Sequence, residues 1–219
     1  MNRPWGDFKK TREFFPDPRK SSVDGLVSVS QGVSPDFLFE AYSFGIFPWP
    51  HEGYPMLWFS PDRRGVIDLN ELKCPKSFKK LLKKVDWTFT TNQAFEEVIH
   101  YCSIVQRSGQ KGSWITDEMK KAYIEFYKMG YAQSFECWSG NRLIGGLYGV
   151  WVANIFSAES MFFLESGASK FCLYNMALHF KNQGFEYVDI QMVTSVTKQF
   201  GGKYIPKEDF LKLLNSLKT

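Results

Sequence analysis

Apolar and polar positions along residues 142–202 follow an order that predicts two strands, a helix and a third strand. The first strand is an apolar, glycine-rich run over residues 143–153, and the second contains a single carboxylate, Glu159. Apolar side chains then recur at helical spacing over residues 170–183, and a glycine ends this pattern. Residues 187–191 form a short apolar strand. This order of elements is typical of an α/β core, so we expect the stretch to lie at the centre of the fold.

The rest of the pattern places further elements around that centre. A first helix begins after Ser34, because a capping serine, a proline and an aspartate follow one another there. Two prolines stiffen the loop over residues 45–50, which reads GIFPWP. Residues 57–64 read as a strand that enters a turn. Further strands are predicted over residues 25–29, 87–91 and 132–138, and further helices over residues 73–85, 93–102 and 207–217 and after a cap at Thr116.

The composition describes a chain that can bury a large core. Of its 219 residues, 44% are hydrophobic and 17% are aromatic, and the net charge is +4. Aromatic side chains usually fill the core, but in this number some can serve as flat stacking surfaces. The four cysteines are isolated, which disfavours structural zinc and fits a reducing cytosol. No stretch resembles a signal peptide or a bilayer span, so we expect a soluble cytoplasmic protein without a membrane partner.

Several kinds of chemistry are not indicated. The three histidines are isolated from one another and from any nucleophile motif, and none forms a metal-ligand pair at helical spacing. No phosphate-binding glycine loop follows a strand. The glycines at 145, 146 and 149 lie inside a strand pattern, where they predict a bulge or a close backbone approach. The sequence therefore argues against hydrolase triads, zinc chemistry and nucleotide-dependent phosphoryl transfer.

The predicted helix over residues 73–85 carries a face of lysines without a neighbouring acid. The lysines on this face are Lys76, Lys79, Lys80, Lys83 and Lys84. Most charged helix faces are merely solvated. However, a helix without any i,i+4 carboxylate forgoes an easy stabilisation, and concentrated positive charge is what a phosphate backbone requires. Both interpretations stay open on the charge pattern alone.

The remaining candidates for chemistry are one carboxylate and one short strand end. Asp189 and Gln191 share a face of their strand, since strand side chains alternate. A carboxylate there can orient the amide of Gln191, whose oxygen can accept a hydrogen bond from an incoming amine, with Glu159 nearby. The alternative is that Asp189 caps a neighbouring element and Gln191 is a surface residue. Trp49, in the stiff loop, is likewise either a core side chain or a stacking platform.

Seven short strings occur in the chain in one order, between about residues 25 and 214. They are AYSFGIFPWP, WFSPD, GSWIT, RLIGGLYGV, AESMFF, GASK and VDIQ. In this combination the chain resembles the leucyl/phenylalanyl-tRNA–protein transferases. The resemblance implies a mixed α+β or α/β chain, with a small N-terminal domain over residues 1–66 and an acetyltransferase-like (GNAT-type) catalytic domain over residues 67–219. It implies a cytoplasmic, monomeric enzyme that needs no cofactor.

The resemblance also implies an activity and roles for individual residues. Such an enzyme transfers Leu or Phe, and possibly Met, from aminoacyl-tRNA to the N-terminal Arg or Lys of an acceptor protein, which marks that protein for degradation. Asp189, Gln191 and Glu159 match the catalytic positions. The side chains that match the aminoacyl-adenosine site are Trp49, Trp114, Ser160 and Met161. The lysine helix matches a tRNA-binding cluster. The chain departs from the family pattern at Gln133 and Val196, where histidine is usual.

Two rival functions are compatible with the same elements. An acyl-CoA-dependent N-acyltransferase needs a glycine-rich pyrophosphate loop, and residues 167–169 are a poor version of one. A tRNA-binding protein without catalysis needs the lysines and tryptophans but neither Asp189 nor Gln191. Substitution of these two residues distinguishes the rival from the enzyme.

Overall fold

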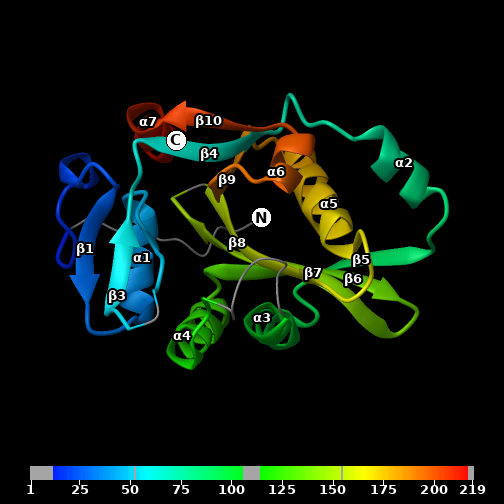
Figure 1. Ribbon diagram of the computed structural model, residues 1–219, viewed down its shortest axis with the longest axis horizontal. Coiled ribbons are helices and arrows are strands. Elements are labelled where there is room, and N and C mark those ends of the chain that lie inside the picture. Colours follow the sequence, from blue (N-terminus) through cyan, green and yellow to red (C-terminus); the bar gives the residue numbers. More distant parts are fainter. Residues whose placement is uncertain (1–11, 52, 106–113, 154, 217–219) are drawn as a thin grey trace.

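The computed structural model describes residues 12–51, 53–105, 114–153 and 155–216 and contains a small and a large sheet (Figure 1). Residues 1–11, where the sequence shows no signal-like segment, lie outside the described residues. In the small sheet, β3 (Met56–Phe59) pairs on either side with β1 (Leu26–Ser30) and β2 (Phe47–Pro48), always antiparallel. Helix α1 (Pro35–Ser43) lies beside this sheet, and its predicted cap is confirmed, because Ser34 accepts the N–H of Phe37.

The large sheet has seven strands, and it determines where the site lies. Its only parallel pair within the described chain is β8–β9, which pairs at two positions and is joined by α5 (Ala168–Asn182). This mixed sheet flanked by helices confirms the predicted α+β class. The strands lie in the order β10 (Gly202–Pro206), β4 (Arg63–Asp68), β9 (Tyr187–Gln191), β8 (Ile155–Phe163), β7 (Arg142–Val152), β6 (Ala132–Ser139) and β5 (Trp87–Thr91).

Helices cover both faces of the large sheet and bury an apolar core on each. One core joins α3 (Phe95–Ile104) and α4 (Asp117–Lys128) to α1 and the small sheet, with Trp58 wholly buried among them. The other joins α5 to the opposite face of the sheet (Figure 1). Within the described residues, no helix combines the length and the apolar character that crossing a bilayer requires. The two cores hold helices against both faces of the large sheet.

The glycines of β7 confirm the predicted close approach and bulge. A Cβ at Gly145 would collide with Ala168, at the start of α5, so its absence lets that helix lie against the strand. The register of β7 and β8 shifts between Tyr148 and Gly149, where a Cβ would meet the backbone oxygen of Ser157. These two glycines thus shape the part of the sheet that carries Ser157 and Glu159.

The lysine helix is shorter than predicted. Helix α2 spans Lys76–Leu82, because Pro75 occupies its cap position without a side-chain hydrogen bond and Lys83 already belongs to the closing turn. The prediction over residues 73–85 is therefore wrong at both ends. Its faces are nevertheless as expected, since Phe78 is buried and the five lysines are exposed.

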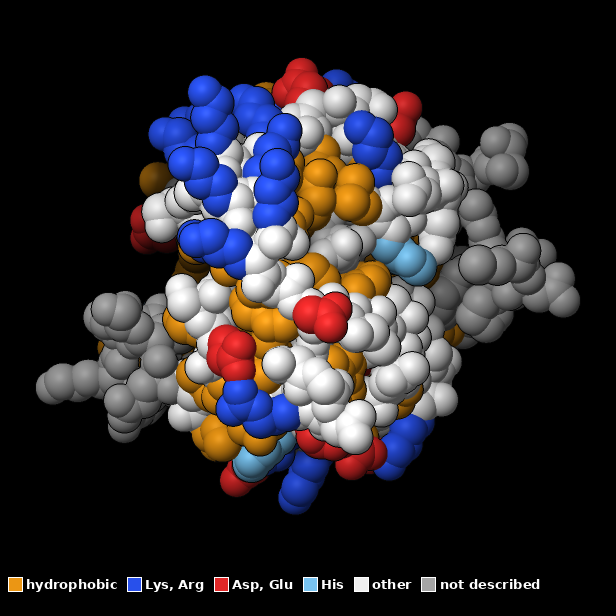
Figure 2. Space-filling model, turned by 90° about the vertical axis from the view of Figure 1, so that its right-hand side faces the viewer, with side chains coloured by type: hydrophobic (Ala, Val, Ile, Leu, Met, Phe, Trp, Pro, Cys, Tyr) orange, Lys and Arg blue, Asp and Glu red, His pale blue; other side chains and the backbone are white. Residues whose placement is uncertain are grey.

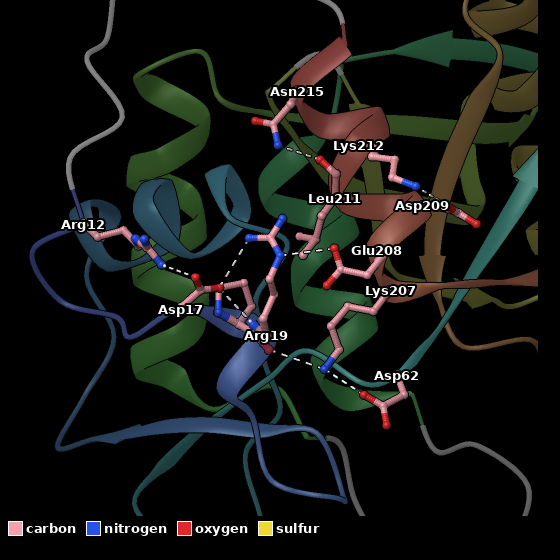
Figure 3. Close-up of polar contacts among 11 residues, drawn as sticks. Arg12, Asp17, Arg19, Asp62, Lys207, Glu208, Asp209, Leu211, Lys212 and Asn215 are labelled. Atoms are coloured by element: carbon pink, nitrogen blue, oxygen red, sulfur yellow. Dashed lines mark hydrogen bonds and ion pairs between the residues drawn. The ribbon is translucent and has the colours of Figure 1, made fainter.

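Lys207, the first residue of α7 (Lys207–Ser216), joins the small sheet to the large one. Its ammonium forms an ion pair at 2.8 Å with Asp62, which lies between β3 and β4 (Figure 3). It also donates to Ser21 Oγ at 2.7 Å. A neighbouring ion pair joins Arg19 to Glu208 at 3.1 Å. Because Lys207 is only 8% exposed, these bonds help to fix the position of the small sheet relative to the large one.

Candidate functional site

An open cleft of about 1560 Å³ collects most of the residues that the sequence predicted. It is lined by the β2–β3 loop, the start of α4, strand β8, the start of α5 and the end of β9. Such a volume exceeds what one small ligand requires, so two substrates can lie in it together. The predicted residues among its walls are Trp49, Trp114, Glu159, Ser160, Met161 and Gln191.

Asp189 lies beneath the cleft as half of a buried ion pair. Its carboxylate accepts two parallel hydrogen bonds from Arg64, Nε at 2.8 Å and Nη2 at 2.7 Å, and it is wholly inaccessible to solvent. Arg64 also donates from Nη1 to the carbonyl of Gly45, and its guanidinium lies 4.5 Å from the ring centres of both Phe47 and Phe210. This bidentate pair holds the carboxylate in one orientation.

The hydrogen bonds of Asp189 differ from the predicted ones. The carboxylate accepts the backbone N–H of Gln191 at 2.9 Å and the hydroxyl of Ser157 at 2.7 Å. Together with Arg64 these donors occupy both oxygens, so Asp189 has no lone pair directed at the cleft. We expected this carboxylate to orient the amide of Gln191 directly. It fixes the backbone of that residue instead.

Gln191 has a backbone conformation that few residues other than glycine adopt. Its φ is +51°, and the N–H of Met192 donates to the carbonyl of Ile190 across it, which makes a γ-turn. A Cβ on the facing residue, Gly65, would collide with the backbone of Met192, so glycine there leaves room for the turn. Strain of this kind persists where the surroundings enforce it, and it gathers at functional sites.

The amide of Gln191 is held from the other side by Glu159. Nε2 donates to Glu159 Oε1 at 2.7 Å, and this leaves the amide oxygen to accept a donor from the cleft. Glu159 is half-buried, and loss of hydration raises the pKa of its carboxyl to about 8. A bond from Tyr42 opposes that rise and the charge of Asp189 adds to it. The carboxyl can therefore exchange a proton near neutral pH.

A pair of buried tyrosines extends this polar chain away from the cleft. Tyr123 donates to Glu159 Oε2 at 3.3 Å, and its hydroxyl lies 2.7 Å from that of Tyr42. Burial, followed by the nearby charge of Glu159, raises the pKa of both phenols well above the usual range. Both hydroxyls thus stay protonated, and Tyr123 can act as a permanent donor to Glu159.

The two tryptophans line the cleft, whereas the lysines of α2 lie on a helix that borders it through other residues. Trp49 and Trp114 are half-buried, and Trp49 lies parallel to His51, with ring centres 6.4 Å apart. Each can therefore present a ring face to the cleft. Helix α2 borders it through Ser77, Phe78 and Leu81, and no ion pair involves its lysines among the described residues. Figure 2 shows lysine and arginine side chains gathered beside exposed apolar ones on the face to which α2 belongs.

Sequence reasoning missed four residues of this network: Arg64, Ser157, Tyr42 and Tyr123. A signal existed for Arg64, because it leads directly into an apolar strand, where an arginine needs a buried carboxylate. No comparable pattern marks the other three. Among the described residues, no group of three or more His, Cys, Asp or Glu side chains could hold a metal ion.

The cleft and the hydrogen-bonded side chains beside it suit a group-transfer enzyme. They combine a carboxyl of near-neutral pKa, a fixed amide oxygen and space for two substrates, which suits transfer of an acyl group to an amine. Comparison with known proteins identifies the particular kind. The family model described as leucyl/phenylalanyl-tRNA protein transferase matches residues 66–215, and that of its N-terminal domain matches residues 32–62. The chain belongs to this family.

Curated relatives agree over nearly the whole chain. A leucyl/phenylalanyl-tRNA–protein transferase of Christiangramia forsetii is 42% identical over 94% of this chain and 99% of its own. One of Flavobacterium johnsoniae is 39% identical over 93% of this chain and 96% of its own. Among solved structures, the L-PGS of Bacillus licheniformis covers 73% of this chain and 50% of its own at 11% identity, and its TM-score of 0.41 is too low to support an argument.

Proposed function

We propose that this protein transfers Leu or Phe from aminoacyl-tRNA to the N-terminal amine of an acceptor protein that begins with Arg or Lys. The observation that carries the proposal is the amide of Gln191, fixed through its backbone by Asp189 and through its side chain by Glu159. Its free oxygen is an acceptor placed at a cleft wall, which is what orientation of an attacking amine requires. The names of the curated relatives supply the donor.

The donor would bind through stacking, apolar contact and charge. We assign the terminal adenosine to Trp49 and Trp114, because base stacking on an aromatic ring needs no particular sequence. Ser160 and Met161 line the same cleft, where Met161 offers an adaptable apolar contact for the Leu or Phe side chain. The exposed lysines of α2 would meet the acceptor stem, since they have no competing ion pair in the described chain.

The transfer itself needs positioning and one proton acceptor. The amine nitrogen attacks the ester carbonyl, the new C–N bond forms, and the C–O bond to the ribose breaks. The proton that the amine loses passes through Glu159 to the ribose oxygen. The α-amine of a peptide has a pKa of roughly 7.7–8.0, close to the value of about 8 for Glu159, so a proton can pass between them with little change in free energy. Alignment of two bound substrates supplies about 7–11 kcal/mol in well-organised cases.

Asp189 serves this reaction without contact with either substrate. Because both its oxygens are occupied, it acts as a positioning residue that keeps Gln191 in the left-handed turn. Glu159 then has two tasks: it aligns the amide while ionised, and it takes the proton that the amine releases. We thus assign the proton transfer to Glu159 and to Gln191 the hydrogen bond that orients the incoming amine.

The same proposal includes the domain division and the finer fold class. We infer a small N-terminal domain and a GNAT-type catalytic domain, divided near residue 66. The parallel β8–β9 pair, which meets at only two positions beside Glu159, supports the second assignment. Since charged tRNA is made and used in the cytoplasm, we place the enzyme there, as a monomer.

A transfer assay tests the proposal. Purified protein is mixed with Leu-tRNA or Phe-tRNA, labelled in the amino acid, and with peptides that begin with Lys, Arg, Asp or Glu. We expect label in the Lys and Arg peptides, and its loss with Gln191→Ala at unchanged tRNA affinity. Binding of charged tRNA without transfer to any peptide would contradict the proposal and favour a tRNA-binding protein.

A further inference from the structure

The two ends of the cleft carry opposite charge. At one end lie the lysines of α2 together with Lys170, since Leu81 of α2 lies against Gly167 at the start of α5. At the other end, Gln31 and Gly32 follow β1 and face the first turn of α4, which carries Glu118. In Figure 1, α2 lies at the upper right and α4 at the lower left of centre. A polyanion and a cation can therefore enter the same cleft from different sides.

Glu118 is fixed at this second end by the backbone opposite it. Its Oε1 accepts the N–H of Val33 at 3.2 Å, and a side chain at Gly32 would collide with that oxygen. The neighbouring Asp117 has its own cation, Lys120, at 2.8 Å. No described cation lies within ion-pair distance of Glu118, although its side chain is exposed. One carboxylate oxygen is thus anchored and the other is available to the cleft.

Only two carboxylates line the cleft among its described residues, Glu118 and Glu159. Glu159 already accepts bonds from Gln191 and Tyr123 and lies beside the reacting amine. A cationic side chain that enters the cleft needs a carboxylate to replace its water, and it cannot share the one occupied by the amine. Glu118 and Glu159 line the same cleft, and Tyr123, which bonds to Glu159, belongs to the same helix as Glu118.

We propose that Glu118 is the residue that recognises the basic side chain of the acceptor's first residue. The proposal rests on the proposed function and adds to it the group that selects Arg or Lys. The α-amine lies at Gln191 and Glu159, while the guanidinium or ammonium pairs with the available oxygen of Glu118. A carboxylate in the first turn of a helix also favours that helix, but this local effect requires no contact with Gly32 or Val33.

The test compares two acceptor peptides that are identical except for Arg or citrulline as the first residue. Citrulline has nearly the shape of arginine and no charge. We expect kcat/KM to favour the Arg peptide about tenfold in the unchanged protein, as is typical of a hydrogen bond to a charged group. Glu118→Gln, which can still accept the N–H of Val33, should remove that preference and leave the KM for aminoacyl-tRNA unchanged. Glu125→Gln, at an exposed position of the same helix, is the matched control and should keep the preference.

Charge reversal provides a second readout. Glu118→Lys should reduce transfer to the Arg peptide further and raise transfer to peptides that begin with Asp or Glu. If Glu118→Gln keeps the tenfold preference, or if the unchanged protein shows none, this inference is wrong while the proposed function stands. If the unchanged protein transfers to no peptide at all, the proposed function itself fails.

Discussion

Substitution of Asp189 by Asn should damage the fold as well as the reaction. The carboxylate accepts bonds from Arg64 Nε and Nη2, Ser157 and the N–H of Gln191. Asn keeps one acceptor oxygen and places an NH₂ group against donors at the other position. More important, it leaves the charge of Arg64, which is 2% exposed, without a counter-ion.

The size of the effect follows from the burial of the pair. Removal of one partner from a buried ion pair costs about 3–5 kcal/mol. This is a large part of the roughly 5–15 kcal/mol by which most proteins are stable, and for a chain of this length it lowers Tm by about 6–20 °C. Urea unfolding followed by circular dichroism measures the free energy, and single-turnover transfer measures the rate. A free energy of unfolding within about 0.5 kcal/mol of the unchanged protein would refute the reasoning.

A double variant separates stability from catalysis. Arg64→Met combined with Asp189→Leu removes both charges and keeps the site apolar, so it should recover most of the lost stability. It cannot recover activity, because the N–H of Gln191 loses its acceptor and the left-handed turn loses its support. If the double variant regained the rate of transfer, Asp189 would have no positioning role.

Three further outcomes are expected. Replacement of three lysines of α2 by alanine (Lys79, Lys80 and Lys83) should make tRNA binding less dependent on salt. The slope of log affinity against log salt concentration should fall by up to about one unit per lost phosphate contact. An unchanged slope would mean that this lysine face is only solvated. Trp49→Ala and Trp114→Ala should each raise the KM for charged tRNA by the equivalent of about 1–3 kcal/mol and leave the KM for peptide unchanged. If a variant instead loses the circular-dichroism signal of the folded protein, that tryptophan belongs to the core. Because Glu159 must be ionised to accept a proton, kcat/KM should rise with pH, with a midpoint at about 8. Tyr123→Phe removes a bond that lowers this pKa, so it should move the midpoint higher; an unmoved midpoint would contradict the role of Tyr123.

Sequence reasoning located the central elements because local patterns determine them. The strand over Tyr187–Gln191 and the cap of α4 at Thr116 were both predicted as found. Periodicity failed at the ends of α2, where the apolar and lysine positions continue past Pro75 and Lys83 but the helix does not. A proline at the cap and the closing turn outweighed the pattern there.

The sequence predicted which residues form the site but not how they are hydrogen-bonded to one another. Glu159, Asp189 and Gln191 were all found near the cleft, yet the bond between the two strand residues runs through the backbone. A positive φ at a glutamine has no sequence signal, because the Asp189 carboxylate that bonds its N–H is itself held by Arg64, 125 residues away in the chain. Pairing over such a distance depends on the sheet order, which single-sequence patterns do not encode.

The separation of Arg64 and Asp189 by 125 residues in the sequence also affects when the site can assemble during synthesis. A ribosome adds about 5–20 residues per second, so Arg64 is synthesised roughly 6–25 s before the carboxylate that neutralises it. Lys207, which joins the two sheets, is synthesised later still. A nascent chain therefore has no assembled site until translation is nearly complete. A truncated product that ends before β9 would retain the lysines of α2 and could still bind charged tRNA, but it would not transfer the amino acid.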